Sequence, residues 1–303
     1  MNIAISGATS MIGAALTNRL LERNHNVIAI IRKKSSKIET LNCNPNLSII
    51  QCNMEDYCAL DKIIEAKVDI AVSLAWNGTR GAGRNNKVIQ EENYNNSISF
   101  LKEMMKKGCQ KFITAGSQAE YGSWDSNEKL KEDVTPNPNT EYGKYKLKFY
   151  EFAKDYCHKN GCKLVEPRFF SLFGPGDYEG TLIISTLKKM INDEPCELTD
   201  CNQIWDFLYI DDAVDGLIKL IENNIPEGIY NFGSGYSAPL KDFIGEMKDI
   251  TKSDSELRYG AINYPSTGIV NVNPDVRKLV GIGWRNRTSF RLGIRKIICN
   301  SEM

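Results

Sequence analysis

Histidine is rare in this sequence: among 303 residues there are two, His25 and His158. Nine cysteines are present, but none of them forms a C-x-x-C pair. Zinc sites are normally built from closely spaced cysteines and histidines, so no metal site is predicted. A chain of this length can bury a large core without disulfides. The odd number of scattered cysteines therefore predicts reduced thiols and a cytoplasmic protein.

Neither sign of charge is in excess, because Lys plus Arg and Asp plus Glu each number 38. Without a basic excess, neither nucleic acid nor an anionic membrane is predicted as a partner. No run approaches the roughly 20 apolar residues of a transmembrane helix. The N-terminus reaches glycine and polar residues too early for a signal peptide. A composition of 42% hydrophobic and 25% charged residues is typical of a globular protein.

Short apolar runs alternate with amphipathic stretches in the first part of the chain, which is typical of βαβ units in a parallel sheet. Ile12, Leu16 and Leu20 share one helical face, which predicts a helix soon after the first strand. The strands are predicted at Asn2–Ile5, Val27–Ile31, Leu47–Gln51, Val68–Leu74, Lys111–Thr114 and Lys163–Pro167.

A glycine turn, from Gly7 to Gly13, follows the first predicted strand. A glycine ahead of a helix permits a tight turn, and the free N–H groups and the dipole of the helix N-terminus favour a pyrophosphate. A turn without a phosphate is the alternative. The cofactor residues expected here are Gly7, Thr9, Ser10, Met11, Ile12 and Gly13.

These patterns predict an α/β protein with a Rossmann-type, doubly wound parallel sheet and a smaller C-terminal α+β domain. The alternation of apolar runs and amphipathic stretches becomes irregular after Phe173. The segments Phe207–Glu222 and Gly228–Phe232 are predicted to rejoin the sheet as a strand-helix piece and a strand. Residues 1–170 and 203–234 are therefore assigned to a dinucleotide-binding domain. Residues 171–202 and 235–303 are assigned to a substrate-binding domain.

The end of the second strand indicates which nicotinamide nucleotide binds. An acidic residue there accepts from the adenosine ribose, whereas a basic one accommodates a 2′-phosphate. Arg32 and Lys33 occupy this place. They favour NADP(H), with NAD(H) possible, although basic residues can also simply cap a surface loop. Leu74 and Ala75, which end the fourth strand, are expected beside the cofactor.

Tyr142 and Lys146 lie four residues apart on a predicted helix, so their side chains share one face. An ammonium beside a phenol stabilises the phenolate, which lets the tyrosine exchange a proton with a carbonyl or an alcohol. The spacing alone is weak evidence, because Tyr150 and Lys154 repeat it on the same helix. Tyr142 is preferred because it lies near the helix start, after a loop, where a side chain can face a cleft.

Ser117 follows the strand Lys111–Thr114, at the edge where parallel sheets place ligands, and its hydroxyl can donate to a reacting oxygen. Later landmarks are PRFFSLFGPG at 167–176, WDFLYIDD at 205–212 and YNFGSG at 230–235. With the glycine turn and the Ser117, Tyr142 and Lys146 set, these motifs resemble the extended short-chain dehydrogenase/reductase family over nearly the whole chain. One departure is Ser10, which stands at the middle glycine of the family's GxxGxxG turn.

The resemblance implies roles for particular residues. Tyr142 is implied as the acid/base, Lys146 as the contact to the nicotinamide ribose and Ser117 as the contact to the substrate oxygen. Further cofactor contacts are implied for Asn53, Met54 and Phe170. Further substrate contacts are implied for Trp76, Gln118, Glu120, Ser171 and Trp205. The resemblance also implies a homodimer formed through the helices around Phe100 and Phe149.

Family members of this kind act on nucleotide-sugars as 4-keto reductases, 4-epimerases or 4,6-dehydratases. The dehydratases resemble each other in an Asp-Glu pair directly after the Ser/Thr, where this chain has Gln118 and Ala119, so dehydration is not expected. Because Arg32 favours NADP, we expect NADPH-dependent reduction of a 4-keto-6-deoxy sugar, as in the branch containing CDP-abequose and CDP-paratose synthases. The alternatives are a 4-epimerase with bound NAD and a catalytically inactive, NADP-binding regulatory protein.

Trp205 stands where many relatives have an arginine for the sugar diphosphate. Arg168, Arg277 and Arg285 are candidates for the replacing cation, and each can equally be a structural or solvated charge. Trp76 and Trp205 can stack on a base or sugar, or simply pack against other side chains.

Overall fold

The computed structural model describes residues 1–35, 37–124, 128–264 and 270–300. The chain forms two compact units. The first comprises residues 1–122, 135–169 and 214–230, and the second comprises residues 123–134, 170–213 and 231–303. No helix in the described ranges is long and apolar enough to cross a membrane.

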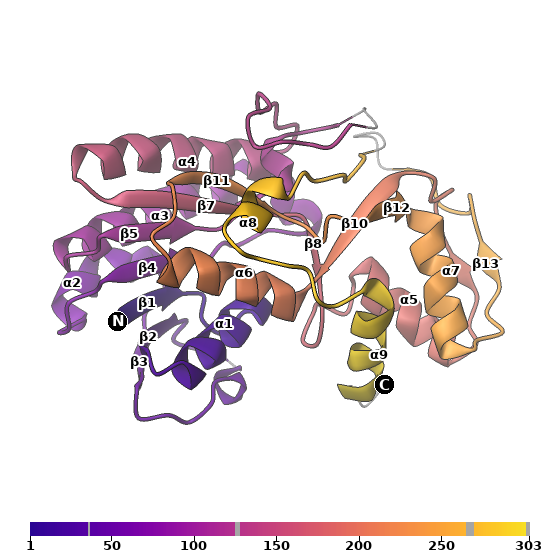
Figure 1. The fold of residues 1–303 in the computed structure, drawn as a ribbon, viewed down its shortest axis with the longest axis horizontal. Coiled ribbons are helices and arrows are strands. Elements are labelled where there is room, and N and C mark those ends of the chain that lie inside the picture. The colour runs from indigo at the N-terminus through magenta and orange to yellow at the C-terminus, as the bar shows by residue number, and fades with distance from the viewer. Residues whose placement is uncertain (36, 125–127, 265–269, 301–303) are drawn as a thin grey trace. The chain divides into compact units, whose positions relative to one another are not determined.

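A large parallel sheet forms the centre of the first unit (Figure 1). Its strand order is β11-β7-β5-β4-β1-β2-β3, and the short β6 pairs with β7. The order reverses at β1, which pairs with both β2 and β4. The predicted strands are all present, with ends shifted by at most two residues. The strands are β1 (Asn2–Ser6), β2 (Asn26–Ile31), β3 (Leu47–Gln51), β4 (Ile70–Ser73), β5 (Lys111–Thr114), β6 (Gly116–Ser117), β7 (Lys163–Phe169) and β11 (Gly228–Phe232).

Helices cover both faces of this sheet, so it is doubly wound (Figure 1). On one face, Phe100 of α3 and Phe149 of α4 pack against Phe112 of β5. Both helix rings are fully buried within one chain. A dimer through α3 and α4 would therefore use other residues of these helices, and the homodimer stays a prediction. The helical elements are α1 (Met11–Glu22), α2 (Leu60–Ile63), α3 (Lys87–Lys106), α4 (Glu141–Lys159), α6 (Ile210–Glu222), η1 (Ile38–Thr40), η2 (Met54–Ala59), η3 (Gly81–Asn85) and η4 (Gln118–Glu120).

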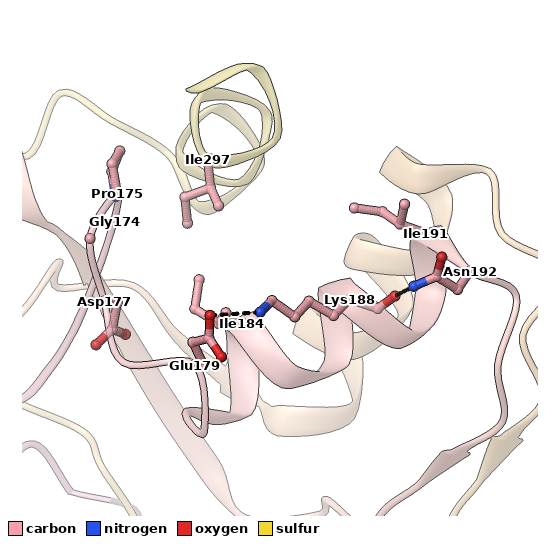
Figure 2. A pocket seen from close by; sticks show the side chains of 10 residues that line it. Gly174, Pro175, Asp177, Glu179, Ile184, Lys188, Ile191, Asn192 and Ile297 are labelled. Atoms are coloured by element: carbon pink, nitrogen blue, oxygen red, sulfur yellow. Dashed lines mark hydrogen bonds and ion pairs between the residues drawn. The ribbon is translucent and has the colours of Figure 1, made fainter. Parts of the chain in front are cut away.

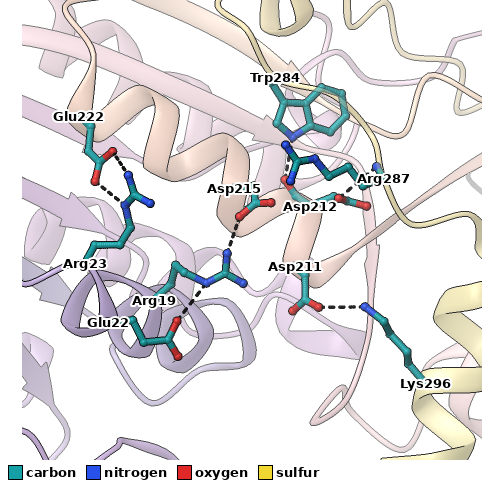
Figure 3. A network of polar contacts seen from close by, with 10 residues as sticks. All are labelled: Arg19, Glu22, Arg23, Asp211, Asp212, Asp215, Glu222, Trp284, Arg287 and Lys296. Carbon is teal, nitrogen blue, oxygen red and sulfur yellow. Dashed lines mark hydrogen bonds and ion pairs between the residues drawn. The ribbon is translucent and has the colours of Figure 1, made fainter.

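Ion pairs hold the C-terminal part of α6 to α1 on the other face. Arg19 donates to Asp215 at 2.6 Å, and Arg23 makes two hydrogen bonds of 2.6 Å with Glu222 (Figure 3). Lys111 Nζ also donates to backbone carbonyls at the end of α6, at 2.8 to 2.9 Å. Carbonyls at a helix end lack partners within the helix, so this lysine both caps α6 and anchors it to β5.

The second unit contains a three-stranded sheet in the order β12-β10-β8. Because β10 pairs with β8 and β12, residues 203–213 belong to this unit, whereas the sequence placed them in the first domain. The core is aromatic, with Phe290 between Phe173, Phe207 and Phe243 at ring distances of 4.8 to 5.3 Å. The elements are β8 (Ser171–Phe173), β9 (Cys196–Glu197), β10 (Ile204–Tyr209), β12 (Ser237–Pro239), β13 (Leu257–Arg258), α5 (Leu182–Ile191), α7 (Leu240–Thr251), α8 (Arg277–Gly281) and α9 (Phe290–Asn300).

Asp212, at the start of α6, anchors the segment before α9 within the second unit. Its carboxylate accepts from the N–H groups of Arg287 at 3.2 Å and Thr288 at 2.8 Å, and its carbonyl accepts from Trp284 Nε1 at 2.8 Å (Figure 3). The Trp284 side chain is buried. One aspartate thus fixes both the backbone and the largest buried side chain of that segment.

Glu222→Gln is expected to lower the free energy of unfolding by about 1 kcal/mol near neutral pH. Hydrogen bonds from Arg23 lower the pKa of Glu222 to about 2, whereas a glutamate in an unfolded chain titrates near about 4.3. The stabilisation is therefore complete above the unfolded pKa and is lost as the pH falls through the folded one. Urea unfolding at about pH 7 and about pH 3 measures this loss. Glu227→Gln, at an exposed carboxylate, is the control, and an equal effect of both substitutions would contradict the prediction.

Candidate active site

A cavity of about 350 Å³ lies at the carboxyl ends of β1, β2 and β4 in the first unit. This is the reversal point of the strand order, where open α/β sheets bind ligands. The sequence-predicted residues that line it are Gly7, Thr9, Ser10, Arg32, Met54, Leu74, Ala75 and Trp76. Sequence reasoning did not predict the lining residues Ser35, Lys37, Tyr57, Asn77 and Gly78.

The glycine turn brings the start of α1 into close contact with the end of β1. A Cβ atom on Gly13 would lie 2.2 Å from the carbonyl oxygen of Gly7, so no larger residue fits without a shift. Ser10 is the N-cap of α1, and its Oγ accepts from the Gly13 N–H at 3.1 Å. The middle position of the family turn is thus filled by a capping serine.

The first N–H groups of α1 are available to a ligand. Those of Met11 and Ile12 have no hydrogen-bond partner in the part of the chain that the structure describes. Unpaired donors and the helix dipole together favour an anion. The turn and the cavity beside it therefore fit the pyrophosphate of a dinucleotide.

The basic residues after β2 differ in where their side chains lie. Arg32 and Lys37 line the cavity, and the hydroxyls of Thr9 and Ser35 lie 3.1 Å apart there. Lys33 does not line it, because its Nζ pairs with Asp56 at 2.7 Å.

Asn53 also has local partners. Its Oδ1 accepts from the Lys33 N–H at 3.0 Å, and its Nδ2 donates to Glu55 at 3.1 Å. Lys33 and Asn53 thus join the loop after β2 to η2. Their cofactor contacts stay predictions, and the basic side chains that line the cavity are Arg32 and Lys37.

The structure brings Ser117, Tyr142 and Lys146 into one region. Tyr142 and Lys146 are buried on α4, and the Ser117 side chain lies beside the Tyr142 phenol. Burial raises the pKa of Tyr142, while the Ser117 side chain and the charge of Arg84 act against this rise. Lys146 Nζ donates to the Ala115 carbonyl at 2.7 Å, and burial lowers its pKa to about 8.

Trp76 and Arg84, from the loop after β4, contact this set. The Trp76 ring meets the Tyr142 ring edge-on at 6.3 Å, and Lys146 Nζ lies 3.8 Å from the Trp76 centroid. The Arg84 guanidinium lies 4.6 Å from the Tyr142 centroid. Sequence reasoning missed Arg84, because no motif marks an arginine in a glycine-rich loop.

A buried charge cluster lies behind Ser117. Arg168 is fully buried and pairs with Glu120 at 3.0 Å and Glu166 at 2.8 Å. Glu120 also accepts from the Ser117 N–H at 2.7 Å. Burial raises the pKa of both carboxyl groups, and that of Glu166 is raised further by the charge of Glu120.

Two assignments made from the sequence change because of this cluster. Glu120 is fully buried, so it supports the backbone of Ser117 and does not contact a substrate. Arg168 is a structural charge and not a diphosphate ligand. Gln118 remains a candidate substrate contact, because its Oε1 is a buried acceptor without a partner among the described residues.

The other sequence-predicted residues lie in the second unit. Phe170 precedes β8, Ser171 begins it, and Trp205 lies on β10. The Trp205 Nε1 is buried without a hydrogen-bond partner in the described ranges. Arg277 pairs with Asp275, and Arg285 donates to backbone carbonyls, so both have structural partners.

A separate cavity of about 440 Å³ lies within the second unit, between the loop at 174–179, α5 and Ile297 of α9 (Figure 2). Lys188 points along α5 toward Glu179 and pairs with it at 3.0 Å. Sequence reasoning marked Gly174 to Gly176 only as a break in the chain. Across the described residues, no group of His, Cys, Asp and Glu side chains is placed to hold a metal ion.

Comparison with known proteins gives full-length similarities. A sequence model of the NAD dependent epimerase/dehydratase family matches residues 3–233. CDP-abequose synthase of Salmonella muenchen is 27% identical, and the alignment covers 99% of this chain and 98% of the relative. UDP-glucose 4-epimerase of Thermotoga maritima, solved with UDP-glucose, has a TM-score of 0.89 at 21% identity and 99% coverage of both chains. UDP-glucose 4-epimerase of Thermus thermophilus, solved with NAD, has a TM-score of 0.86 at 17% identity, covering 99% of this chain and 100% of that one. At these identities the solved structures share the fold.

Arg168→Met is expected to lower the free energy of unfolding by about 3 to 5 kcal/mol, because it leaves two buried carboxyl groups without their cation. Urea unfolding measures the loss. Arg277→Met, at an exposed arginine, is the control and should cost less than about 1 kcal/mol. Equal stability of the Arg168→Met and unmodified proteins would show that the cluster is not structural.

Proposed function

Because the chain belongs to the NAD dependent epimerase/dehydratase family, we propose that it is an NADPH-dependent reductase acting on the 4-keto group of a nucleotide-linked 4-keto-6-deoxy sugar. The observation that carries this proposal is the buried Tyr142 beside Ser117, on the same helix as the buried Lys146. The full-length similarity to CDP-abequose synthase supports a nucleotide-sugar as the substrate.

In the proposed reaction, Tyr142 and Ser117 act on the same substrate oxygen. A bound reduced nicotinamide would supply the hydride to C4. Tyr142 Oη gives its proton to the carbonyl oxygen, which becomes the alcohol, while the Ser117 hydroxyl donates a hydrogen bond to it. Lys146, with its pKa of about 8, is mostly an ammonium at neutral pH and would bind the nicotinamide ribose.

The cavity beside the glycine turn supports NADP(H) over NAD(H). Arg32 and Lys37 line it, and no acidic side chain does so among the described residues. A basic side chain here can bind a 2′-phosphate, whereas NAD is normally held by a carboxylate on the ribose. The hydroxyls of Thr9 and Ser35 would add donors for phosphate oxygens.

A 4-epimerase with bound NAD is the second candidate. The Tyr142 and Ser117 pair favours it equally, because a phenol that gives a proton in reduction takes one in oxidation. A 4,6-dehydratase is disfavoured, because Gln118 and Ala119 supply no acid or base and Glu120 is fully buried. The assembled Ser117, Tyr142 and Lys146 set argues against an inactive NADP-binding protein.

Tyr142→Phe is expected to lower kcat for NADPH oxidation by at least about a hundredfold, because it removes the proton donor. The assay mixes the protein with NADPH and CDP-, dTDP- and GDP-linked 4-keto-6-deoxy sugars and follows the reduced-nicotinamide absorbance. Tyr150→Phe is the matched control, because it removes the phenol of the other Tyr-x-x-x-Lys pair. Copurified NAD with inversion at C4 and no net oxidation would support the epimerase instead.

Arg32→Ala is expected to weaken NADPH binding by about tenfold and to leave NADH binding unchanged, because only NADPH carries the 2′-phosphate. Fluorescence titration of each reduced nucleotide measures the two dissociation constants. Lys34→Ala removes a positive charge from the same segment, outside the cavity lining, and is the control. An equal loss for both nucleotides in Arg32→Ala would argue against a 2′-phosphate contact.

A further inference from the structure

The guanidinium of Arg84 lies over the ring of Tyr142, with Cζ 4.6 Å from the ring centroid. Its Nη1 donates to the carbonyl of Thr79 at 2.9 Å, which fixes one edge of the group. Arg84 forms no ion pair with a carboxylate in the ranges that the structure describes. Its positive charge is therefore not compensated by a neighbouring carboxylate and acts on the tyrosine.

Gln90, fully buried on α3, fixes the loop that carries Arg84. Its Nε2 donates to the carbonyls of Gly78 at 3.0 Å and Gly83 at 2.8 Å. Its Oε1 accepts from Trp76 Nε1 at 2.7 Å. One side chain thus holds both ends of the loop segment and one of the rings that packs against Tyr142.

A second contact ties this loop to the helix of Tyr142. The Asn85 side chain accepts from the N–H of Glu141 at 3.2 Å, directly before Tyr142 in the chain. Arg84 directly precedes the acceptor residue of this hydrogen bond, and Tyr142 directly follows the donor residue. This contact holds the loop segment of Arg84 beside the first turn of α4.

Lys146 lies farther than Arg84 from the ring of Tyr142. Its Nζ lies 6.0 Å from the Tyr142 centroid but 3.8 Å from that of Trp76. It also donates to the Ala115 carbonyl at 2.7 Å. Of the two cations, Arg84 is the nearer to the Tyr142 ring.

The charged groups that face Tyr142 come from its own helix and from two other segments. Arg84 and Arg80 lie in the loop after β4, Glu120 lies on η4, and Lys146 lies on α4 itself. Burial raises the pKa of Tyr142, whereas the Ser117 side chain and the charges of Arg84 and Arg80 lower it. Glu120 opposes the phenolate, but it is paired with Arg168.

We propose that Arg84 is a positioning residue whose guanidinium, in addition to the ammonium of Lys146, stabilises negative charge on Tyr142 while the phenol transfers its proton. A phenolate spreads its charge into the ring, so a cation over the ring face stabilises the anion more than the neutral phenol. The catalytic consequence rests on the proposed function, whereas the electrostatic effect on Tyr142 exists without turnover.

The first test replaces Tyr142 with 2,3-difluorotyrosine, which ionises at lower pH than tyrosine, and follows its titration by fluorine NMR. Arg84→Met should move the midpoint upward by about one pH unit, because it removes the nearest cation. Arg84→Lys keeps a positive charge and should move it less, which also separates lost charge from a folding defect. Lys87→Met removes an exposed positive charge from the start of α3 and should leave the midpoint unchanged. An unmoved midpoint in Arg84→Met would overturn the proposal.

The second test follows kcat for sugar reduction against pH in the protein with natural tyrosine. Reduction needs the protonated phenol, so activity falls as the pH rises through the Tyr142 pKa. Arg84→Met should move this fall to higher pH by the amount seen in the fluorine titration, without a matching change in the sugar KM. A change in KM alone would assign Arg84 to substrate binding and contradict the proposal.

The two tests separate this inference from the proposed function. A shifted fluorine titration in a protein that oxidises NADPH with none of the sugars leaves the effect of Arg84 standing and removes the reductase. If the protein reduces a sugar but Arg84→Met changes neither the fluorine titration nor the pH profile, the reductase assignment stands and the proposed effect of Arg84 is excluded.

Discussion

The packing of the first turn of α4 against the segment after Ser117 is the constraint on which the rest of the candidate site depends. It places the Tyr142 phenol beside Ser117, which ends β6 and caps η4. The helix comes close enough because Gly143 has no side chain: a Cβ atom there would lie 2.3 Å from the Ala119 carbonyl oxygen. Thr140 caps the helix at the same end by accepting from the Gly143 N–H at 3.1 Å. The position of the phenol is therefore set by backbone packing at the first turn of α4.

Burying a phenol, an ammonium and two carboxyl groups in one region carries an electrostatic cost that the surrounding side chains offset. Arg168 pairs with both buried carboxyl groups, and Glu120 in turn holds the backbone N–H of Ser117. Buried charges normally persist only where they are paired and hydrogen-bonded. The cluster is thus a rigid support for the serine.

The sequence predicted the parts of this protein that local patterns determine. The strands of the large sheet and the glycine turn follow from apolar periodicity and from the position of glycine before a helix. Tyr142 and Lys146 could be paired because residues four apart share one helix face, and the family resemblance joined Ser117 to them. The sheet to which a strand belongs depends on contacts between distant segments. The sequence predicts β10 as a strand, but its partners β8 and β12 place it in the second unit.

Side-chain partners were beyond the reach of the sequence, since they depend on contacts between distant segments. Lys33 and Lys37 are both basic residues after β2, and only the folded chain shows that Asp56 pairs with the first while the second lines the cavity. From the sequence, Glu120 and Arg168 are possible ligand contacts. The structure shows that they pair with each other and that both side chains are fully buried. Arg84 carries no sequence signal, because its role arises from a loop that Gln90 fixes from another helix.

Ser10 gives the glycine turn a property that a glycine in its place would not. By accepting from the Gly13 N–H, its hydroxyl satisfies one donor of α1 within the chain itself. The turn is thereby ordered without a ligand. An anion at this helix end would meet the N–H groups of Met11 and Ile12, while that of Gly13 is already occupied.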